Sequence, residues 1–428
     1  MKKYDTYKDS GIEWIGEIPE HWDAVEFKYL FSFSRGLGIT KQDLKDKGIP
    51  CVNYGEIHSK FGFAVNPEIH NLKYVEVEYL DTGEKSLLKR GDFVFADTSE
   101  DIEGSGNFTV LDSDLPTFAG YHTIICRLEE ENNYKYLAFF FDSLEYRNQI
   151  RSSVSGIKVF SITQAIIKSS TVLLPPLDEQ TAIAEYLDKK TTEVDELISD
   201  KEELLKLYEE EKTAVINRAV NKGINPDARM KDSGIEWLGE IPEHWEVKSL
   251  KYVMKSLNNI RIPLSADERG KMSIRKYDYY GASGIIDKVE DYLFDESLIL
   301  IGEDGANLVT RNSRLSFIAR GKYWVNNHAH ILKPKVGILE YYCELMEICD
   351  YTIWISGSAQ PKLTSENLMN IKIAVPPTVE QQSIVNYIES ETSRIDKKID
   401  ETQKLIDLLK EYREALISEV VTGKVKVV

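Results

Sequence analysis

Long apolar runs are missing from this sequence of 428 residues. No stretch approaches the roughly 18 consecutive apolar residues that a membrane-spanning helix requires. The start, Met-Lys-Lys-Tyr-Asp, leads into no apolar segment of the kind that directs secretion. We therefore expect a cytoplasmic protein with no membrane partner.

Cysteine is also scarce, with four residues in the whole chain: Cys51, Cys126, Cys343 and Cys349. They form no Cys-x-x-Cys pair and have no histidine at zinc-finger spacing, which argues against a disulfide framework and a structural zinc site. We expect four buried, reduced thiols and no metal site. His328 and His330 form a His-x-His pair, which could ligate a metal but is more often structural. We expect one of them to be buried and the other exposed and hydrogen-bonded.

Motifs for two kinds of catalysis are absent. An adenine methyltransferase would be expected to carry Asn- or Asp-Pro-Pro-Tyr/Phe, yet the two Pro-Pro pairs here follow Leu174 and Val375. A phosphate-binding loop ends in Gly-Lys-Ser/Thr, and the chain offers only Gly270-Lys-Met, Gly321-Lys-Tyr and Gly423-Lys-Val. We expect no catalytic residue and no cofactor bound by this chain.

Positive charge is in deficit, since the formal net charge is -18. Taken alone, this argues against a nucleic-acid partner, because phosphate contacts need Lys and Arg. The excess is unevenly placed, however: the segment from Asp178 to Lys212 carries -8 and the segment from Glu380 to Glu419 carries -4, which is twelve of the eighteen excess charges. The rest of the chain is therefore much closer to neutral.

An internal repeat organises the chain. Residues 8–22 read KDSGIEWIGEIPEHW and residues 231–245 read KDSGIEWLGEIPEHW, with one difference. A second pair, Pro-Pro-Leu-Asp-Glu-Gln from Pro175 and Pro-Pro-Thr-Val-Glu-Gln from Pro376, lies downstream. Each copy is thus an opening motif, a body and a Pro-Pro exit, and the bodies barely resemble each other outside Ile162-Thr163 and Leu363-Thr364. This pattern favours two readers of different targets in one frame, with plain duplication and drift as the alternative.

A long amphipathic helix is predicted after each Pro-Pro pair, because apolar residues recur every three or four positions. The first runs from Asp178 to about Arg218, and the second follows Pro377 and stops near Gly423. The second helix keeps the alternating spacing of a coiled-coil seam. The members of this seam are Ile395, Ile399, Thr402, Ile406 and Leu409. We expect the two helices to pair, the alternative being that each packs on its own domain.

Strand-like segments alternate with Gly-, Asn- and Asp-rich turns in both bodies. They are Asp92–Ala96, Thr123–Arg127, Ser297–Ile301 and His330–Lys333. The expected fold class is α+β: two α/β domains alternating with two long helices that pair as an antiparallel coiled-coil spacer. The expected segments are 1–175, the first domain with its opening motif; 176–226, the first helical spacer; 227–375, the second domain; and 376–428, the second spacer.

The whole chain resembles the specificity subunits of Type I restriction-modification complexes. The strings that carry the resemblance are SGIEWIGEIPEHW, PPLDEQ-x-x-I, DTSEDIEGSGN (97–107), GIKVFSIT (156–163), YYGASGI (279–285), LIGEDG (300–305) and YWVNNHAHIL (323–332). The resemblance implies that the two bodies are target-recognition domains, each of which reads one half of a split target in double-stranded DNA. It also implies that the paired helices set the unread gap between the halves.

The resemblance implies partners as well. Two methyltransferase subunits would dock on the helices, and restriction/translocase subunits would complete the complex. S-adenosylmethionine, ATP and magnesium are expected on these partner subunits. The acid-rich helices would then face protein partners and solvent, away from the DNA phosphates.

DNA contacts are expected from basic and amide side chains and from Tyr-Gly loops in the bodies, because Arg and Lys read guanine, Asn and Gln read adenine, and Gly permits close approach to a sugar-phosphate strand. Some of these charges will simply be solvated, and Tyr-Gly is also a common turn. The candidates in the first body are Arg35, Lys41, Asn53, Tyr54, Lys60, Arg90, Arg127, Arg147 and Arg151. Those in the second are Arg261, Arg269, Lys271, Arg275, Lys276, Tyr280, Arg311, Arg314 and Lys362.

Two rival functions remain open. A protein-only adaptor would have two binding domains on a helical spacer and would show no salt-dependent affinity for DNA. A nuclease or methyltransferase that acts alone would modify DNA when purified by itself.

Overall fold

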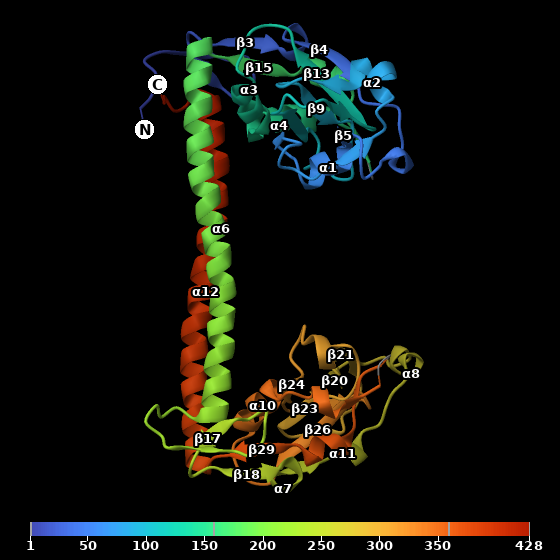
Figure 1. Cartoon of the computed structure of the whole chain (residues 1–428), viewed down its shortest axis with the longest axis vertical. Coiled ribbons are helices and arrows are strands. Elements are labelled where there is room, and N and C mark those ends of the chain that lie inside the picture. Colours follow the sequence, from blue (N-terminus) through green and yellow to red (C-terminus); the bar gives the residue numbers. More distant parts are fainter. Residues whose placement is uncertain (1, 157–158, 358–359, 428) are drawn as a thin grey trace. The chain divides into compact units, whose positions relative to one another are not determined.

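The computed structural model describes residues 2–156, 159–357 and 360–427. It divides into two compact units (Figure 1): unit 1 comprises Met1–Glu202 and Lys404–Val428, and unit 2 comprises Glu203–Gln403. Each unit contains one opening motif, one body and a stretch of each long helix. We describe the two units separately.

The body of unit 1 is built from two sheets. A five-stranded sheet has the order β4 (Phe31–Arg35), β13 (Thr123–Leu128), β9 (Phe93–Ala96), β11 (Phe108–Leu111), β6 (Ala64–Val65). A four-stranded sheet has the order β7 (Lys73–Val75), β5 (Ile49–Val52), β12 (Thr117–Ala119), β8 (Leu87–Leu88). The helices of this body are α1 (Tyr54–Ser59), α2 (Tyr79–Thr82), α3 (Tyr134–Asp142), α4 (Leu144–Ser153) and α5 (Gln164–Ser169).

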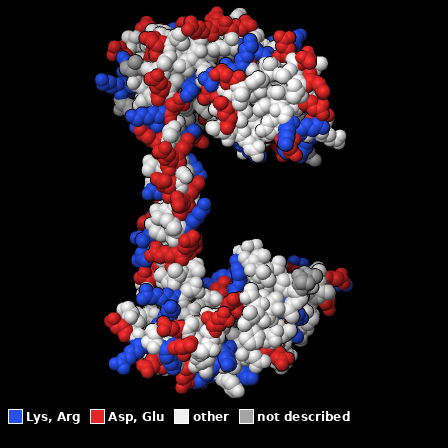
Figure 2. Space-filling model, viewed as in Figure 1, with Lys and Arg blue, Asp and Glu red and all other residues white. Residues whose placement is uncertain are grey.

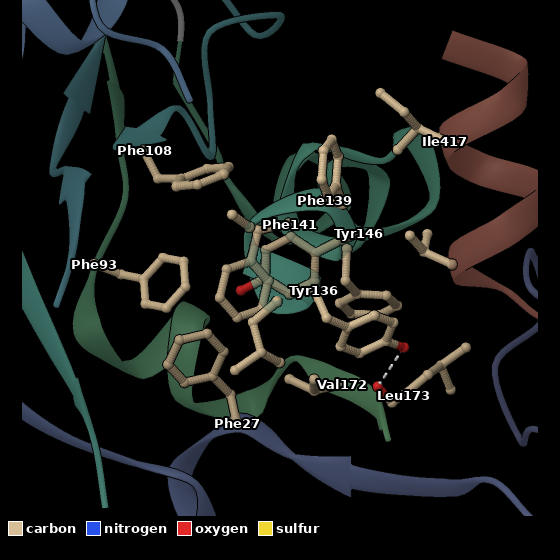
Figure 3. Packing of buried hydrophobic residues seen from close by; sticks show 14 of the residues in the cluster. Phe27, Phe93, Phe108, Tyr136, Phe139, Phe141, Tyr146, Val172, Leu173 and Ile417 are labelled. Atoms are coloured by element: carbon tan, nitrogen blue, oxygen red, sulfur yellow. Dashed lines mark hydrogen bonds between the residues drawn. The ribbon is translucent and has the colours of Figure 1, made fainter. Parts of the chain in front are cut away.

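Aromatic side chains fill the core between the five-stranded sheet and helices α3 and α4 (Figure 3). Every residue of β9 is buried, as expected for a strand that is covered on both faces. Phe93 of β9 and Phe108 of β11 meet Phe141 of α3 edge-on, and Phe95 of β9 meets it in a tilted contact. The buried Tyr136 hydroxyl donates a hydrogen bond of 2.9 Å to the carbonyl of Leu173, so this polar group keeps a partner inside the core.

The body of unit 2 repeats the two-sheet plan with four strands in each sheet. One sheet has the order β19 (Met254–Ser256), β26 (Ala329–Pro334), β23 (Leu298–Gly302), β24 (Ser316–Ala319). The other has the order β21 (Gly284–Val289), β20 (Tyr277–Gly281), β25 (Lys322–Val325), β22 (Phe294–Asp295). The helices are α7 (Leu250–Val253), α8 (Ala266–Gly270), α9 (Asn307–Thr310), α10 (Leu339–Ile348) and α11 (Ser365–Asn370). The four strands expected from the sequence are confirmed as β9, β13, β23 and β26.

Two-stranded sheets form the repeated frame. The opening motifs fold as the hairpins β1 (Tyr7–Asp9) with β2 (Glu17–Pro19) and β16 (Met230–Asp232) with β17 (Glu240–Pro242). The strand after each motif pairs with the strand before each Pro-Pro: β3 (Asp23–Glu26) with β15 (Thr171–Leu174), and β18 (Glu246–Ser249) with β29 (Lys372–Val375). Two further pairs are β10 (Thr98–Ser99) with β14 (Phe160–Ser161) and β27 (Ile355–Ser356) with β28 (Lys362–Leu363).

The two long helices are confirmed as α6 (Leu177–Lys222, 46 residues) and α12 (Thr378–Val421, 44 residues). They pair within each unit. In unit 1 Asp195 and Glu202 of α6 meet Arg413 and Lys410 of α12 at 2.9 and 3.8 Å, so the numbering falls on one helix as it rises on the other. The pairing is therefore antiparallel, as expected.

The same direction holds in unit 2, where Tyr208 and Glu211 of α6 contact Lys398 and Arg394 of α12. The predicted seam is confirmed: Ile395, Thr402 and Ile406 are buried, and Ile399 and Leu409 are half-buried. On the face that Figure 2 shows, Asp and Glu are frequent along the helical part of the chain, with Lys and Arg between them. No helix in the described part of the chain is both long and apolar enough to cross a membrane.

Each unit is completed by the helix end of the other copy. The last turns of α12, with Leu416, Val420 and Val421, enter the core of unit 1 beside Trp22 of the first opening motif. The last turn of α6, with Val220, enters the core of unit 2 beside Trp245 of the second. The two tryptophans are equivalent in the repeat, and both are fully buried.

The Glu-Gln pair that follows each Pro-Pro pair forms hydrogen bonds within the repeated frame. In unit 1 Glu179 pairs with His21 at 2.8 Å, and in unit 2 Glu380 pairs with His244 at 2.7 Å. The following glutamine, Gln180 or Gln381, donates to the carbonyl of the first proline of its own exit and accepts a backbone N–H that precedes α3 or α10. These contacts explain why the frame is repeated almost unchanged.

Candidate nucleic-acid interface

In unit 1, several strands end at one edge of the sheets. The register pairs Arg35, the last residue of β4, with Ile124, and Ala96, the last residue of β9, with Thr123 at the start of β13. β5 and β12 run parallel and end together. The segments that meet here, residues 35–37, 53–58 at the start of α1, 97–107 and 120–122, are called loop edge 1.

Unit 2 has a matching edge. Gly302, the end of β23, pairs with Ala329 at the start of β26, and the parallel strands β20 and β25 end together. The loops that meet there, residues 281–283, 303–307, 326–328 and 360–362, are called loop edge 2.

Backbone hydrogen bonds show which residues of the two edges are equivalent. The N–H of Asp97 donates to the carbonyl of His122, and the N–H of Glu303 donates to the carbonyl of His328. The carbonyls of Asp97 and Glu303 accept the N–H groups of Ile162 and Leu363. The two edges are therefore built on one backbone plan, in which the histidine is the same and the residue that bonds its carbonyl, Asp97 or Glu303, differs.

A pocket of about 660 Å³ opens on loop edge 1, lined by Tyr54, His58, Thr98, Asp101 and Asn107 among others. The Nε2 of His58 lies 2.8 Å from the carbonyl of Thr98, which can only accept, so Nε2 carries the proton. Its Nδ1 accepts from the Asn107 amide at 2.8 Å. The pocket thus combines a neutral histidine with amide and carboxylate groups, a mixture suited to hydrogen bonding with base edges.

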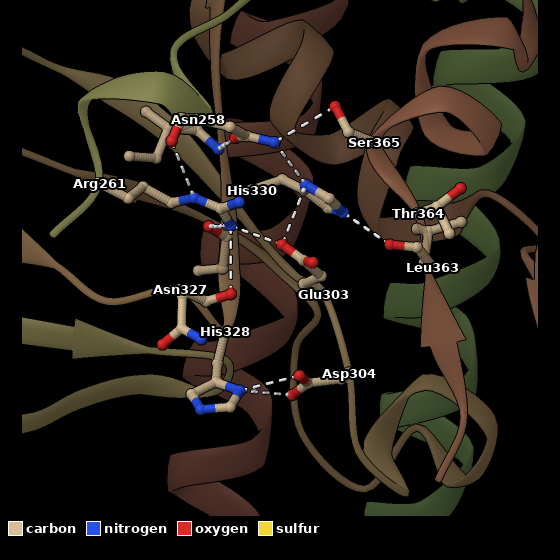
Figure 4. Close-up of polar contacts among 12 residues, drawn as sticks. Asn258, Arg261, Glu303, Asp304, Asn327, His328, His330, Leu363, Thr364 and Ser365 are labelled. Atoms are coloured by element: carbon tan, nitrogen blue, oxygen red, sulfur yellow. Dashed lines mark hydrogen bonds and ion pairs between the residues drawn. The ribbon is translucent and has the colours of Figure 1, made fainter. Parts of the chain in front are cut away.

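A denser polar cluster lies at loop edge 2 (Figure 4). Glu303 accepts from Arg261 at 2.5 Å and pairs with Lys362 at 3.2 Å. Burial raises the pKa of Glu303, but its hydrogen bond with Arg261 and the other nearby cationic groups outweigh burial, so that the net pKa lies below its ordinary value. Glu303 is therefore a carboxylate at neutral pH.

His330 is neutral in this cluster. Burial lowers its pKa, Nε2 donates to the carbonyl of Leu363, and Nδ1 accepts from Asn258. Its 3.6 Å approach to Glu303 is consequently no ion pair, because the facing nitrogen carries no proton. His328 is half-exposed and bonds Asp304, so the expectation of one buried and one exposed, hydrogen-bonded histidine is confirmed. No group of three or more His, Cys, Asp or Glu within residues 2–156, 159–357 and 360–427 could hold a metal ion.

Comparison with known proteins agrees with this two-unit plan. The family model described as "Type I restriction modification DNA specificity domain" matches residues 19–207 and again residues 242–410, one match for each copy of the repeat. The chain belongs to this family. Its role is therefore that of a DNA specificity subunit.

Relatives of this subunit match over different shares of its length. The putative type I restriction enzyme MjaX specificity subunit of Methanocaldococcus jannaschii is 26% identical over 431 residues, which cover 96% of each chain. A putative specificity subunit of Haemophilus influenzae is 31% identical over 168 residues, 38% of this chain and 39% of that protein.

Solved structures share the fold. A chain from a structure that describes complex assembly and conformational transition of the type I R-M system has a TM-score of 0.70 at 16% identity, and covers 95% of this chain and 99% of its own. The HsdS subunit of Thermoanaerobacter tengcongensis has a TM-score of 0.54 at 15% identity, with coverage of 95% and 98%.

Six of the predicted contact residues are held by the specificity subunit's own fold. Arg127 and Arg261 bond Asp92 and Glu303, and their side chains are 25% and 15% exposed. The others donate to carboxylates or backbone carbonyls of their own unit: Arg147, Arg151, Arg269 and Arg311. Their role as DNA contacts stays a prediction, but each would have to exchange an existing partner for DNA.

The other predicted cations lie on the surface. Five are paired with acidic side chains: Arg90, Lys271, Arg275, Arg314 and Lys362. Four are exposed and form no ion pair with any described residue: Arg35, Lys41, Lys60 and Lys276. Loop edge 1 contains Arg35, and loop edge 2 contains Lys362 with Arg261 reaching the same cluster.

The predicted Asn and Tyr residues differ in access. Asn53 is 2% exposed and bonds Glu56 at the start of α1, so its amide serves the fold. Tyr54 is half-buried and lines the pocket of loop edge 1. Tyr280 is half-buried and stacks on Phe317.

The sequence interpretation missed several polar residues that gather at the two edges: His58, Asn107 and His122 at the first, and Asn258 and Asp304 at the second. One signal was available. A histidine stands directly before a strand in both bodies, as Tyr121-His122-Thr123 and Asn327-His328-Ala329.

Proposed function

We propose that this specificity subunit reads a bipartite, asymmetric target in double-stranded DNA, with loop edge 1 reading one half and loop edge 2 the other. The observation that carries this proposal is the contrast between frame and edges. The frame contacts Trp22, His21 and Glu179 recur as Trp245, His244 and Glu380. The loop edges share a backbone plan and one histidine but differ in their other side chains, as two readers of unlike half-sites would.

The chemistry in this proposal belongs to partner subunits. Two methyltransferase subunits bind S-adenosylmethionine and methylate the DNA, while restriction/translocase subunits use ATP and magnesium for translocation and cleavage. The support is the family membership together with the absence from the sequence of an Asn- or Asp-Pro-Pro-Tyr/Phe motif and of a Gly-Lys-Ser/Thr loop. Purified alone, the chain is expected neither to methylate nor to cut DNA, and methylation is expected once the methyltransferase subunits are added.

A methylation map of the genome tests the two-reader proposal. Deleting the chain is expected to erase methylation at a single two-part motif. Replacing the second body, residues 254–370, with that of another family member is expected to change one half of the motif, and replacing the first body is the matched control that changes the other half. If either exchange alters both halves, the two units do not read independently.

The same complex distinguishes the adaptor alternative. A DNA reader loses affinity as salt rises, because bound phosphates release counterions. If the assembled complex shows no salt-dependent affinity for DNA, the chain is an adaptor between proteins and the proposal fails.

A further inference from the structure

A histidine paired with a carboxylate stands at the same backbone position of both loop edges. At loop edge 1 the Nδ1 of His122 lies 3.1 Å from Asp97, which also accepts from the hydroxyl of Thr98. At loop edge 2 the Nδ1 of His328 lies 2.8 Å from Asp304. The carboxylate comes from the first residue after β9 in one unit and from the second residue after β23 in the other.

The two histidines are equivalent although the bodies around them differ. Each precedes the first residue of a central strand, and each gives its carbonyl to the N–H of the residue that follows the neighbouring strand. His122 holds a left-handed backbone with φ of 56°. A non-glycine residue in that conformation is uncommon and costs free energy, so the histidine is not explained by the fold.

The hydrogen-bonding chemistry leaves one ring nitrogen available. A carboxylate can only accept, so Nδ1 of each histidine carries a proton. Nε2 forms no hydrogen bond with any residue that the structure describes, and the side chains of His122 and His328 are 58% and 47% exposed. Figure 4 shows the second ring nitrogen of His328 turned away from Asp304.

We propose that His122 and His328 each bind a backbone phosphate of the DNA duplex through Nε2. The proposal rests on the proposed function and adds a division of labour to it. Whatever is common to two readers of different half-sites cannot distinguish those half-sites. The shared histidine therefore contacts the part of DNA that both half-sites have in common, which is the sugar-phosphate backbone.

The contact requires one proton from solvent. A phosphate oxygen accepts but does not donate, so Nε2 must be protonated to bind it, which makes the ring an imidazolium between two anions. The groups that face His122 are Asp97 and the rings of Tyr54 and Tyr121, and the group that faces His328 is Asp304. Each carboxylate orients its ring and compensates the added charge.

Asparagine substitutions in the complex with the methyltransferase subunits test this inference. His122→Asn and His328→Asn keep a polar side chain, and asparagine tolerates the left-handed backbone at position 122. Each is expected to weaken binding about tenfold, the size of a hydrogen bond to a charged group, and to do so equally for target and non-target duplexes. The slope of log affinity against log salt is expected to fall by about one for each.

Arginine at the same positions provides a rescue. His122→Arg and His328→Arg place a permanent cation beside the same carboxylates. The arginine variants are expected to bind DNA about as tightly as the natural chain, whereas the asparagine variants bind it weakly.

His21→Asn and His244→Asn are the matched controls, because these histidines also pair with carboxylates but lie in the frame. They are expected to leave DNA affinity unchanged. Unchanged affinity in the loop-edge variants would overturn the inference, and so would a loss confined to target DNA, which would make the histidines base readers. If the natural complex fails to bind its target at all, the proposed function fails first.

Discussion

Two glycines at equivalent places in the repeat allow steric crowding to be separated from backbone strain. Gly223 follows α6 and Gly423 follows α12, with φ of 73° and 72°. An added Cβ at Gly423 would lie 2.3 Å from Cδ of Pro19, in a rigid ring, whereas at Gly223 the nearest atoms are 3.3 Å away. Alanine therefore meets the same backbone strain at both positions but a severe clash at only one.

The magnitudes follow from this geometry. Left-handed backbone costs a non-glycine residue about 1–2 kcal/mol. Overpacking against a rigid neighbour adds about 1–3 kcal/mol. We expect Gly223→Ala to destabilise unit 2 by about 1–2 kcal/mol and Gly423→Ala to destabilise unit 1 by about 2–5 kcal/mol. For units of this size each kcal/mol lowers Tm by about 2–4 °C.

Scanning calorimetry of the full chain measures the effect, because the two substitutions lie in different units. Gly11→Ala is the control in unit 1: its φ is 75° and nothing lies within 4 Å of the added Cβ, so it reports the strain alone. The reasoning is refuted if Gly423→Ala lowers the Tm of unit 1 no further than Gly11→Ala does.

Two further predictions concern buried groups. Arg261→Ala leaves Glu303, whose side chain is 10% exposed, without its main partner. We expect this substitution to lower the free energy of unfolding by about 2–3 kcal/mol. Lys362 is half-exposed, and we expect Lys362→Ala to lower the free energy of unfolding by less than about 1 kcal/mol. Because the folded pKa of Glu303 lies below its ordinary 4.5, the stability from its pairing is present above that pH and is lost as pH falls through the folded pKa. Urea unfolding should therefore show the effect of Arg261→Ala shrinking in acid, and a pH-independent loss would contradict this. Burial raises the pKa of Cys343 to about 11 and of Cys349 to about 12, and raises the pKa of Cys51 and Cys126 as well. A thiol reagent at mild alkaline pH should therefore label none of the four in the native chain and all four in denaturant, and rapid native labelling of any would contradict their burial.

Much of the fold could be predicted because its signals are local. The helices α6 and α12 could be predicted from apolar residues at helical spacing after a Pro-Pro pair. The structure differs little from the prediction for α6, which ends at Lys222 and not at about Arg218. β9 and β23 follow from short apolar runs between turns. The four thiols were predicted to be buried, and they are.

The candidate site was harder to predict, because it depends on contacts between distant residues. Arginine is a residue type that often contacts DNA, but Arg261 and Arg127 instead pair with carboxylates of their own units. Glu303 lies 42 positions from Arg261, and Asp92 lies 35 positions from Arg127. His122 meets Asp97 across 25 positions. No periodicity or motif reports which strand ends become neighbours, so the sequence could supply candidates but could not rank them.

The amino-acid sequence alone determined that this chain is a duplicated frame with two unlike bodies and two acid-rich helices. Both the identity between the two copies and the helical spacing of apolar residues are local patterns that are visible in the sequence itself. Only the tertiary structure decided which helix end packs into the core of which unit. The end of α12 packs beside Trp22 in unit 1, and the end of α6 packs beside Trp245 in unit 2. It also decided which cations remain exposed. Both outcomes are set by packing and hydrogen bonding between segments far apart in the chain, where burial of apolar surface and pairing of charge select one arrangement among many that the same local patterns allow.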